Sequence, residues 1–317
     1  MRDVVVIGGG LSGLAAAYEL NRKDIAFTII EVKPRLGGSI RSEAQQGFLL
    51  DAGDMLHQIE NADYFTTFLH QIGLDGAVTP TVDGYLFNNG TDDLIDALSQ
   101  TFSTPVMYRM AVSTLGWLDN DRCSICLENG MLLDARAVIV AAPARHAERM
   151  FYTLVPEISE LLLDYPYEPV VQVSLGYRNV DADLFSLVPP IESPVRMVQA
   201  TIHPARVSAE GLLLHVDMRY DPEAGVPQDP ITKVSRLMNW SVQPATSLAQ
   251  VWPEAKPVSW QKAEHITMMK AIASHLPPNV ALCGSDYLSL RHAPTLEGRI
   301  RQGIAAAHRV LDVLQSG

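Results

Sequence analysis

The chain has 317 residues, of which 47% are hydrophobic and 19% charged, and its net charge is −12. This composition is typical of a globular protein and excludes a wholly disordered or fibrous chain. The acidic balance argues against binding to the phosphate backbone of nucleic acid or to anionic lipid, since both need a basic surface. Because a single core stops growing at roughly 250–300 residues, we expect two domains.

We expect the three cysteines to be structural residues that form neither a disulfide scaffold nor a metal site. Cys123, Cys126 and Cys283 are too few for a disulfide scaffold in a chain of this length. Cys123 and Cys126 form a C-x-x-C on a predicted strand, where residues three apart face opposite ways. Since no second ligand pair exists, we expect no metal site.

No signal peptide or apolar run of about 18 residues is found, which predicts a soluble, cytoplasmic protein that binds no membrane.

The N-terminal part alternates strands and helices. An apolar strand at residues 4–7 ends in glycines, a helix rich in Ala and Leu follows at 11–22, and a second buried strand covers 26–31. This order is a strand–helix–strand unit with parallel strands. The elements predicted next are a strand at 46–51, a helix at 62–72, a strand at 82–87 and a helix at 92–102.

The middle of the chain is rich in strands. Predicted strands cover residues 106–114, 122–127, 131–133 and 137–142, and Asn129-Gly130 predicts a hairpin turn. From residue 151 to 259, alternating segments at 170–175, 195–202 and 212–218 indicate a separate, mainly antiparallel lobe. An apolar strand at 280–283 and a closing helix at 298–314 complete the chain.

The first strand and helix are joined by a dinucleotide-binding pattern. The segment Gly8-Gly9-Gly10-Leu11-Ser12-Gly13 fits G-x-G-x-x-G, which permits a tight turn and offers helix N–H groups to a pyrophosphate. Glu31 ends the second strand, where a carboxylate can accept hydrogen bonds from ribose hydroxyls. A glycine-rich turn that only packs the helix on the sheet is the alternative.

The segment after Glu31 resembles the flavin-dependent amine oxidase superfamily, whose members carry an acid followed by Arg-x-Gly-Gly-Arg. Arg35, Gly37 and Gly38 match this pattern, while Ser39 replaces the second Arg and Arg41 follows two residues later. In the family this loop, which here begins at Val32, lies along the FAD pyrophosphate. The resemblance therefore implies FAD rather than NAD, with Arg41 as a substitute or with one cation fewer.

Further stretches resemble the same superfamily, and the resemblance implies that they contact FAD. They include "Phe-x-x-Asp-x-Gly" with Asp51, the strand at 137–143, an element similar to Ala-Gly-Asp/Glu near the C-terminus, and the start of the closing helix. The implied contacts from these regions are Asp51, Val112, Ala141, Gly284, Asp286, Leu296, Glu297 and Gly298. No cysteine stands in the context that the family uses for a covalent flavin link, so we expect non-covalent FAD.

The substrate side of the resemblance is weaker. Gln172 stands where many amine oxidases carry a Lys near the flavin, and an amide cannot take up a proton as a neutral Lys can. The other candidates near the flavin are Trp260, Tyr287 and His292. Trp260 is equally well read as a core aromatic, and a loop histidine is most often solvated.

The fold class implied is α/β, with a FAD-binding Rossmann-type, glutathione-reductase-like domain and an interleaved β-rich substrate domain. The expected FAD-binding domain covers 1–75, 91–150 and 260–317, and the substrate domain covers 76–90 and 151–259. The implied function is hydride transfer from a small organic substrate, an amine or a dihydro-heterocycle, to FAD, with O₂ or another electron acceptor. The compact layout resembles renalase, which implies an oxidase of dihydronicotinamide isomers as one alternative, and a non-catalytic FAD-binding module is another.

Overall fold

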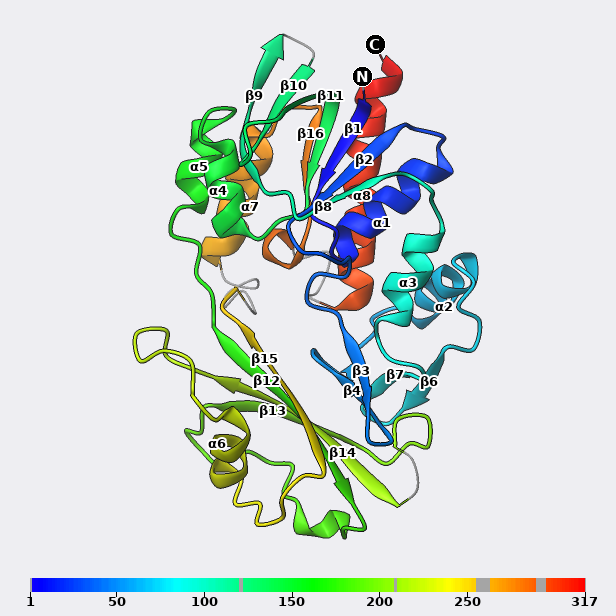
Figure 1. The fold of residues 1–317 in the computed structure, drawn as a ribbon. Helices are drawn as coiled ribbons and strands as arrows, with labels where there is room; N and C mark the ends of the chain where they lie inside the picture. Colours follow the sequence, from blue (N-terminus) through cyan, green and yellow to red (C-terminus); the bar gives the residue numbers. More distant parts are fainter. Residues whose placement is uncertain (1, 120–121, 208–209, 255–262, 289–294, 317) are drawn as a thin grey trace. The chain divides into compact units, whose positions relative to one another are not determined.

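Two groups of elements make up the computed structural model, which describes residues 2–119, 122–207, 210–254, 263–288 and 295–316 (Figure 1). Unit 1 comprises Met1–Gly38, Ile95–Pro166 and Pro257–Gly317. Unit 2 comprises Ser39–Leu94 and Tyr167–Lys256. Helix α3 (Asp93–Gln100) spans the boundary between them.

Unit 1 is built on a seven-stranded sheet of order β8-β2-β1-β11-β10-β9, with β16 also paired to β11. Strands β8, β2, β1, β11 and β16 are parallel, whereas β10 pairs antiparallel with both β11 and β9. The strands are β1 (Arg2–Ile7), β2 (Phe27–Glu31), β8 (Val106–Tyr108), β9 (Val112–Asp119), β10 (Arg122–Leu127), β11 (Leu132–Val140) and β16 (Val280–Leu282).

The centre of this sheet follows from its apolar strands. Val4, Val5 and Val6 are fully buried because β1 has parallel neighbours on both sides and helices cover it. Helices α1 (Leu11–Arg22) and α8 (Leu296–Ser316) pack against each other, and both contact β11 (Figure 1). The other helices of the unit are α4 (Ala144–Phe151), α5 (Pro156–Leu162) and α7 (Ala263–His275).

The strand predicted at residues 106–114 is wrong as a single element. Arg109 has a φ of 57°, in the left-handed region, and the chain turns there between β8 and β9. The two strands predicted at 131–133 and 137–142 are also wrong as separate elements, because β11 runs without a break over Leu132–Val140. The strands predicted at 4–7, 26–31, 122–127 and 280–283 are confirmed within two residues of their ends.

Unit 2 contains a four-stranded antiparallel sheet of order β13-β14-β12-β15. A hairpin, β3-β4, and a three-stranded sheet of order β5-β7-β6 belong to the same unit. The strands are β3 (Ser42–Gln45), β4 (Phe48–Asp51), β5 (Leu56–His57), β6 (Val78–Thr81), β7 (Gly84–Phe87), β12 (Val170–Arg178), β13 (Val195–Thr201), β14 (Gly211–Arg219) and β15 (Thr246–Trp252). Helices α2 (Ala62–Gln71) and α6 (Pro230–Leu237) complete it.

The two central strands of the four-stranded sheet are buried on both faces, and the faces differ in character. On β12, Val171, Val173 and Leu175 point into an apolar core, while Gln172 and Ser174 alternate with them. Strand β14 repeats this pattern, with Val216 in the same core and His215 and Asp217 between its apolar residues. The sheet therefore buries a polar row on one face.

The compact units and the expected domain bounds differ by more than a few residues in two stretches. Residues 39–75 group with unit 2, because hairpin β3-β4 contacts β12, β14 and β15. Residues 151–166 group with unit 1, where α5 packs against α4 and α7. Which unit serves cofactor and which serves substrate stays a prediction. In the described part of the chain, no helix is long and apolar enough to cross a membrane.

Candidate cofactor and active-site residues

The turn between β1 and α1 consists of three glycines, Gly8, Gly9 and Gly10. Gly10 precedes the helix and contributes no side-chain cap to the first N–H groups of α1, at Leu11, Ser12 and Gly13. Helix N-termini of this kind can bind anions through those N–H groups. At Gly13 a Cβ would lie 2.0 Å from the carbonyl oxygen of Gly8, which explains why the closing glycine of the motif carries no side chain. The turn is therefore suited to a pyrophosphate.

Glu31 lies beside this turn at the end of β2. Its side chain is buried, and its two oxygens accept hydrogen bonds from Gly9 N and Lys33 N, each at 2.7 Å. Each carboxylate oxygen can accept two hydrogen bonds, so both retain acceptor capacity for hydroxyl groups. A buried carboxylate fixed in this way is preorganised for the two hydroxyls of a ribose.

The loop after Glu31 folds back onto the glycine turn. Gly37 N donates to Gly9 O at 2.8 Å, and Gly37 forms an isolated bridge with Gly10. The Arg35 guanidinium donates to Leu36 O and Gly38 O, and Lys33 Nζ also donates to Gly38 O. The loop thus brings two cations next to the N-terminus of α1, while Val32 is exposed.

Three other predicted cofactor contacts, Ala141, Val112 and Gly284, lie on or next to strands of the unit 1 sheet. Ala141, directly after β11, donates its N–H to Ile7 O at 2.7 Å and approaches Gly8, and Val112 begins β9 as a buried residue. Gly284 N donates to the Gln302 side chain on α8.

Asp286 has a structural partner. One oxygen of its buried carboxylate accepts the N–H of Ala144 at 2.8 Å, at the first residue of α4. The Tyr165 hydroxyl donates to the Asp286 carbonyl oxygen, and burial together with the Asp286 charge raises the pKa of Tyr165. Tyr287 is also buried, and its hydroxyl donates to Ala142 O at 2.9 Å. Both side chains therefore have roles inside unit 1.

Helix α8 begins with its own cap. Thr295 Oγ1 accepts the N–H of Gly298 at 3.0 Å, which satisfies one of the free N–H groups at the start of the helix. Leu296 and Glu297 are buried in this first turn, and Glu297 pairs with Arg301 at 2.7 Å.

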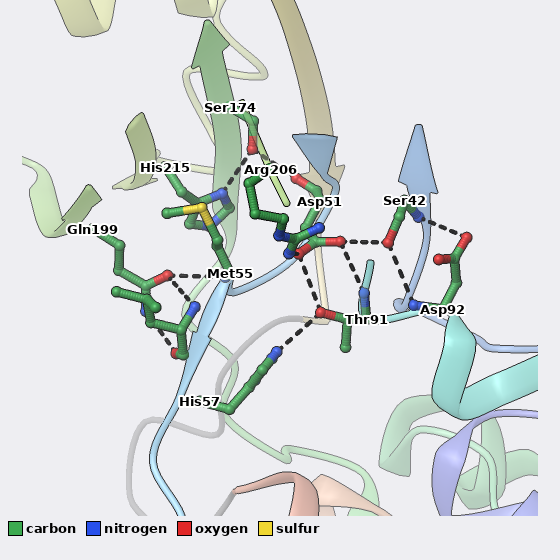
Figure 2. A network of polar contacts seen from close by, with 11 residues as sticks. Ser42, Asp51, Met55, His57, Thr91, Asp92, Ser174, Gln199, Arg206 and His215 are labelled. Carbon is green, nitrogen blue, oxygen red and sulfur yellow. Dashed lines mark hydrogen bonds and ion pairs between the residues drawn. The ribbon is translucent and has the colours of Figure 1, made fainter. Parts of the chain in front are cut away.

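The remaining predicted cofactor residues belong to unit 2. Ser39 is exposed, and Arg41 pairs with Glu43 on β3. Asp51 is buried and pairs with the buried guanidinium of Arg206 (Figure 2). Ser42 Oγ, Thr91 N and Thr91 Oγ1 also donate to the Asp51 carboxylate. Both oxygens of Asp51 are thus engaged by groups of this unit.

Gln172 lies in the buried polar row of the four-stranded sheet. Its amide nitrogen donates to Asp217 Oδ1 at 2.9 Å and to Asp54 Oδ1 at 3.3 Å. In the same row, Ser174 Oγ donates to Asp51 O at 2.6 Å and lies 2.9 Å from His215 Nδ1 (Figure 2). The other two sequence candidates, Trp260 and His292, lie outside the described residues.

Sequence reasoning missed the acids and bases around Gln172. His215 and Asp217 are fully buried although they lie between apolar residues on β14, and Arg206 is buried in the connection before that strand. The signal was present: in an alternating strand, a His and an Asp two residues apart share one face. Without the pairing of β14 with β12, the sequence does not reveal that this face is also buried.

Two family models match this chain. Residues 6–72 match "NAD(P)-binding Rossmann-like domain" and residues 78–184 match "Flavin containing amine oxidoreductase". The chain belongs to the flavin-containing amine oxidase superfamily. The residues of the glycine turn, Glu31 and the loop at 33–38 fit a flavin dinucleotide, because they offer free helix N–H groups, a fixed acceptor carboxylate and two cations in one place.

Curated relatives match parts of this chain. Mitochondrial protoporphyrinogen oxidase of Nicotiana tabacum is 32% identical over 125 residues, which is 37% of this chain and 25% of the relative. Polyamine oxidase 5 of Oryza sativa subsp. japonica is 36% identical over 73 residues, which is 23% of this chain and 15% of the relative. The matches to the first five such relatives span only 10–25% of those proteins' own length.

Solved structures share the fold over nearly the whole chain. A structure from Exiguobacterium sp. 255-15, described with reservation as a protoporphyrinogen oxidase, has a TM-score of 0.77 at 12% identity and covers 98% of each chain. Wild-type putrescine oxidase bound to putrescine has a TM-score of 0.71 at 12% identity, with 98% of this chain and 99% of that chain covered. At this identity the likeness shows the fold alone.

Proposed function

We propose that this protein is an FAD-dependent oxidoreductase that takes a hydride from a small organic substrate, an amine or a dihydro-heterocycle. The observation that carries the proposal is the fixed carboxylate of Glu31, bonded to Gly9 N beside the uncapped N-terminus of α1. Its support from the comparisons is membership of a superfamily named for flavin-containing amine oxidoreductases. When bound, FAD supplies the hydride acceptor, and the protein supplies binding, orientation and exclusion of water.

The chain's own residues would hold the dinucleotide non-covalently. Leu11, Ser12 and Gly13 would donate N–H groups to the pyrophosphate, Glu31 would accept from the ribose, and Lys33 and Arg35 would add positive charge. Covalent attachment by Cys123 or Cys283 is disfavoured because burial raises the pKa of Cys123 to about 11 and of Cys283 to about 12. Such thiols remain protonated and unreactive near neutral pH.

Gln172 favours a substrate that needs no proton acceptor at that position. Its amide is occupied as a donor to Asp217 and Asp54, and an amide cannot bind the proton that an ammonium substrate must lose. The conjugated ring nitrogen of a dihydro-heterocycle such as a dihydronicotinamide carries no proton near neutral pH, so the hydride can leave without a prior proton loss and the condition is met. Between the two proposed substrate classes, the dihydro-heterocycle is therefore the one that the side chains of unit 2 suit better.

The first experiment is an absorption spectrum of the purified protein, followed by anaerobic addition of NADH, NADPH, their isomers and a panel of small amines. A flavin spectrum that bleaches with a dihydronicotinamide, and flavin that acid precipitation releases, are the expected results. Bleaching by an amine alone would contradict the substrate preference. A flavin that no compound reduces would favour a non-catalytic binding module, and a colourless protein that does not bind added FAD would contradict the cofactor.

The cofactor site is tested by Glu31→Gln against Glu160→Gln, an exposed residue on α5. The amide of the variant would turn one NH₂ group toward Gly9 N or Lys33 N, so a donor would face a donor. Loss of a charge-assisted hydrogen bond of about 1.5–3 kcal/mol corresponds to roughly tenfold to hundredfold weaker FAD binding. Equal affinity in the two variants would contradict the role of Glu31.

A further inference from the structure

The buried polar row of unit 2 contains two carboxylates and an imidazole that converge. Side-chain atoms of Asp54, His215 and Asp217 all lie within 4.8 Å of one another. The His215 and Asp217 side chains are fully buried, and Asp54 is half-buried. This group is distinct from the residues that we assign to the dinucleotide.

The tautomer of His215 follows from its neighbour Ser174. The single hydroxyl hydrogen of Ser174 is used in the 2.6 Å bond to Asp51 O, so Ser174 Oγ can only accept from His215 Nδ1, at 2.9 Å (Figure 2). Nδ1 therefore carries a hydrogen. In a neutral imidazole the other nitrogen, Nε2, is then a bare lone pair.

In the neutral form of His215, this lone pair faces a carboxylate. His215 Nε2 is buried and has no hydrogen-bond partner among the described residues, yet it lies 3.4 Å from Asp217 Oδ1. Two electron-rich atoms at this separation repel each other unless a cation lies between them. The separation is longer than the roughly 2.7–2.9 Å of a charge-assisted hydrogen bond. It matches the spacing of about 3.3 Å between two ligands that each lie about 2.0–2.1 Å from one tetrahedral metal ion.

Gln172 orients the two carboxylates of this group. Its amide nitrogen donates to both Asp54 and Asp217, so it can act as an outer-shell partner of metal-binding carboxylates. The nearby Arg206 guanidinium is paired with Asp51. A divalent cation would neutralise the two carboxylates and give the bare nitrogen a partner, and the half-buried Asp54 offers the side from which an ion can enter.

We propose that Asp54, His215 and Asp217 form a binding site for a divalent first-row transition-metal ion. One imidazole nitrogen and two carboxylate oxygens suit Zn²⁺ or Mn²⁺ better than Mg²⁺ or Ca²⁺, which prefer oxygen ligands only. In this site the ion would hold β14 to the segment after β4.

The test uses the untagged protein with its flavin, stripped with a chelator and then equilibrated with Zn²⁺ or Mn²⁺. Metal retained after desalting is measured by mass spectrometry. We expect one ion per chain in the wild type and in the control His70→Asn, which alters an exposed histidine of unit 2 paired with Asp75. His215→Asn keeps a donor for Ser174 but removes Nε2, and Asp217→Asn keeps the shape of the side chain, so both should lose the ion.

A second measurement does not depend on the variants folding. Pulsed electron paramagnetic resonance of the wild type loaded with Mn²⁺ should detect coupling to an imidazole nitrogen. A wild type that retains neither ion, variants that retain it as well as the wild type, or a spectrum without nitrogen coupling would each overturn the proposal.

Discussion

Asp51 and Arg206 form an ion pair in which both side chains are buried, although 155 positions separate them in the sequence. The pair connects the end of β4 to the segment before β14, and Ser42 and Thr91 donate to the same carboxylate (Figure 2). A buried carboxylate is tolerated only when donors and an opposite charge surround it. This network therefore holds together segments of unit 2 that lie far apart in the sequence.

Removal of the guanidinium should destabilise the protein strongly. Arg206→Met leaves the Asp51 charge buried without its partner, and breaking such a pair costs about 3–5 kcal/mol of unfolding free energy. The matched control is Arg219→Met, because Arg219 pairs with Glu168 at 2.9 Å but half of its side chain is exposed. That variant should change the unfolding free energy by about 1 kcal/mol or less. Urea unfolding measures both, and equal losses would contradict the importance of the buried pair.

The crossing of α1 and α8 should not tolerate a methyl group at Gly303. A Cβ at this position would lie 2.2 Å from Ser12 O and 2.9 Å from Ala15 Cβ, so the helices would have to separate. Overpacking of this kind costs about 1–3 kcal/mol. Gly116→Ala on β9 is the control, since nothing lies within 4 Å of its added Cβ. Thermal unfolding should show a lower Tm for Gly303→Ala alone. Weaker FAD binding should accompany it, because Ser12 belongs to the proposed pyrophosphate site.

The three thiols should differ in reactivity. Burial raises the pKa of Cys123 to about 11 and of Cys283 to about 12, whereas Cys126 is half-buried on β10. Since the thiolate is the reactive form, only Cys126 should be alkylated in the folded protein at pH 8, and all three in urea. Peptide mass spectrometry after brief iodoacetamide treatment measures the sites. Labelling of Cys123 or Cys283 under native conditions would contradict their burial.

Alkaline pH should destabilise the fold. Burial also raises the pKa of Tyr177 to about 12, so this hydroxyl and the thiols of Cys123 and Cys283 are held neutral in the folded state above their ordinary values. A group whose pKa is raised on folding stabilises the protein below its unfolded pKa and loses that contribution as the pH rises toward the folded value. The contribution of these three groups to the unfolding free energy should therefore be constant from neutral pH up to about pH 8.5 and then fall steadily through pH 11. A flat profile over this range, measured with urea, would disagree with these shifts.

The sequence by itself determined the features that depend on neighbouring residues. The glycine turn between β1 and α1 and the acid at the end of β2 could be predicted because the strand–helix–strand order lies within the first 31 residues. Local periodicity likewise predicted β12, β13 and β14 of unit 2, although not β15, and placed Cys123 and Cys126 on one strand.

Tertiary structure alone decided which polar groups meet. Asp51 was predicted as a cofactor contact from its motif, but its partner Arg206 comes from a segment 155 positions away. Gln172 was identified by its position, whereas its bond to Asp217 depends on the register of β12 with β14. Residue types and spacing show which face of a strand a side chain occupies. Only strand pairing brings two such faces together and buries Asp217 beside His215.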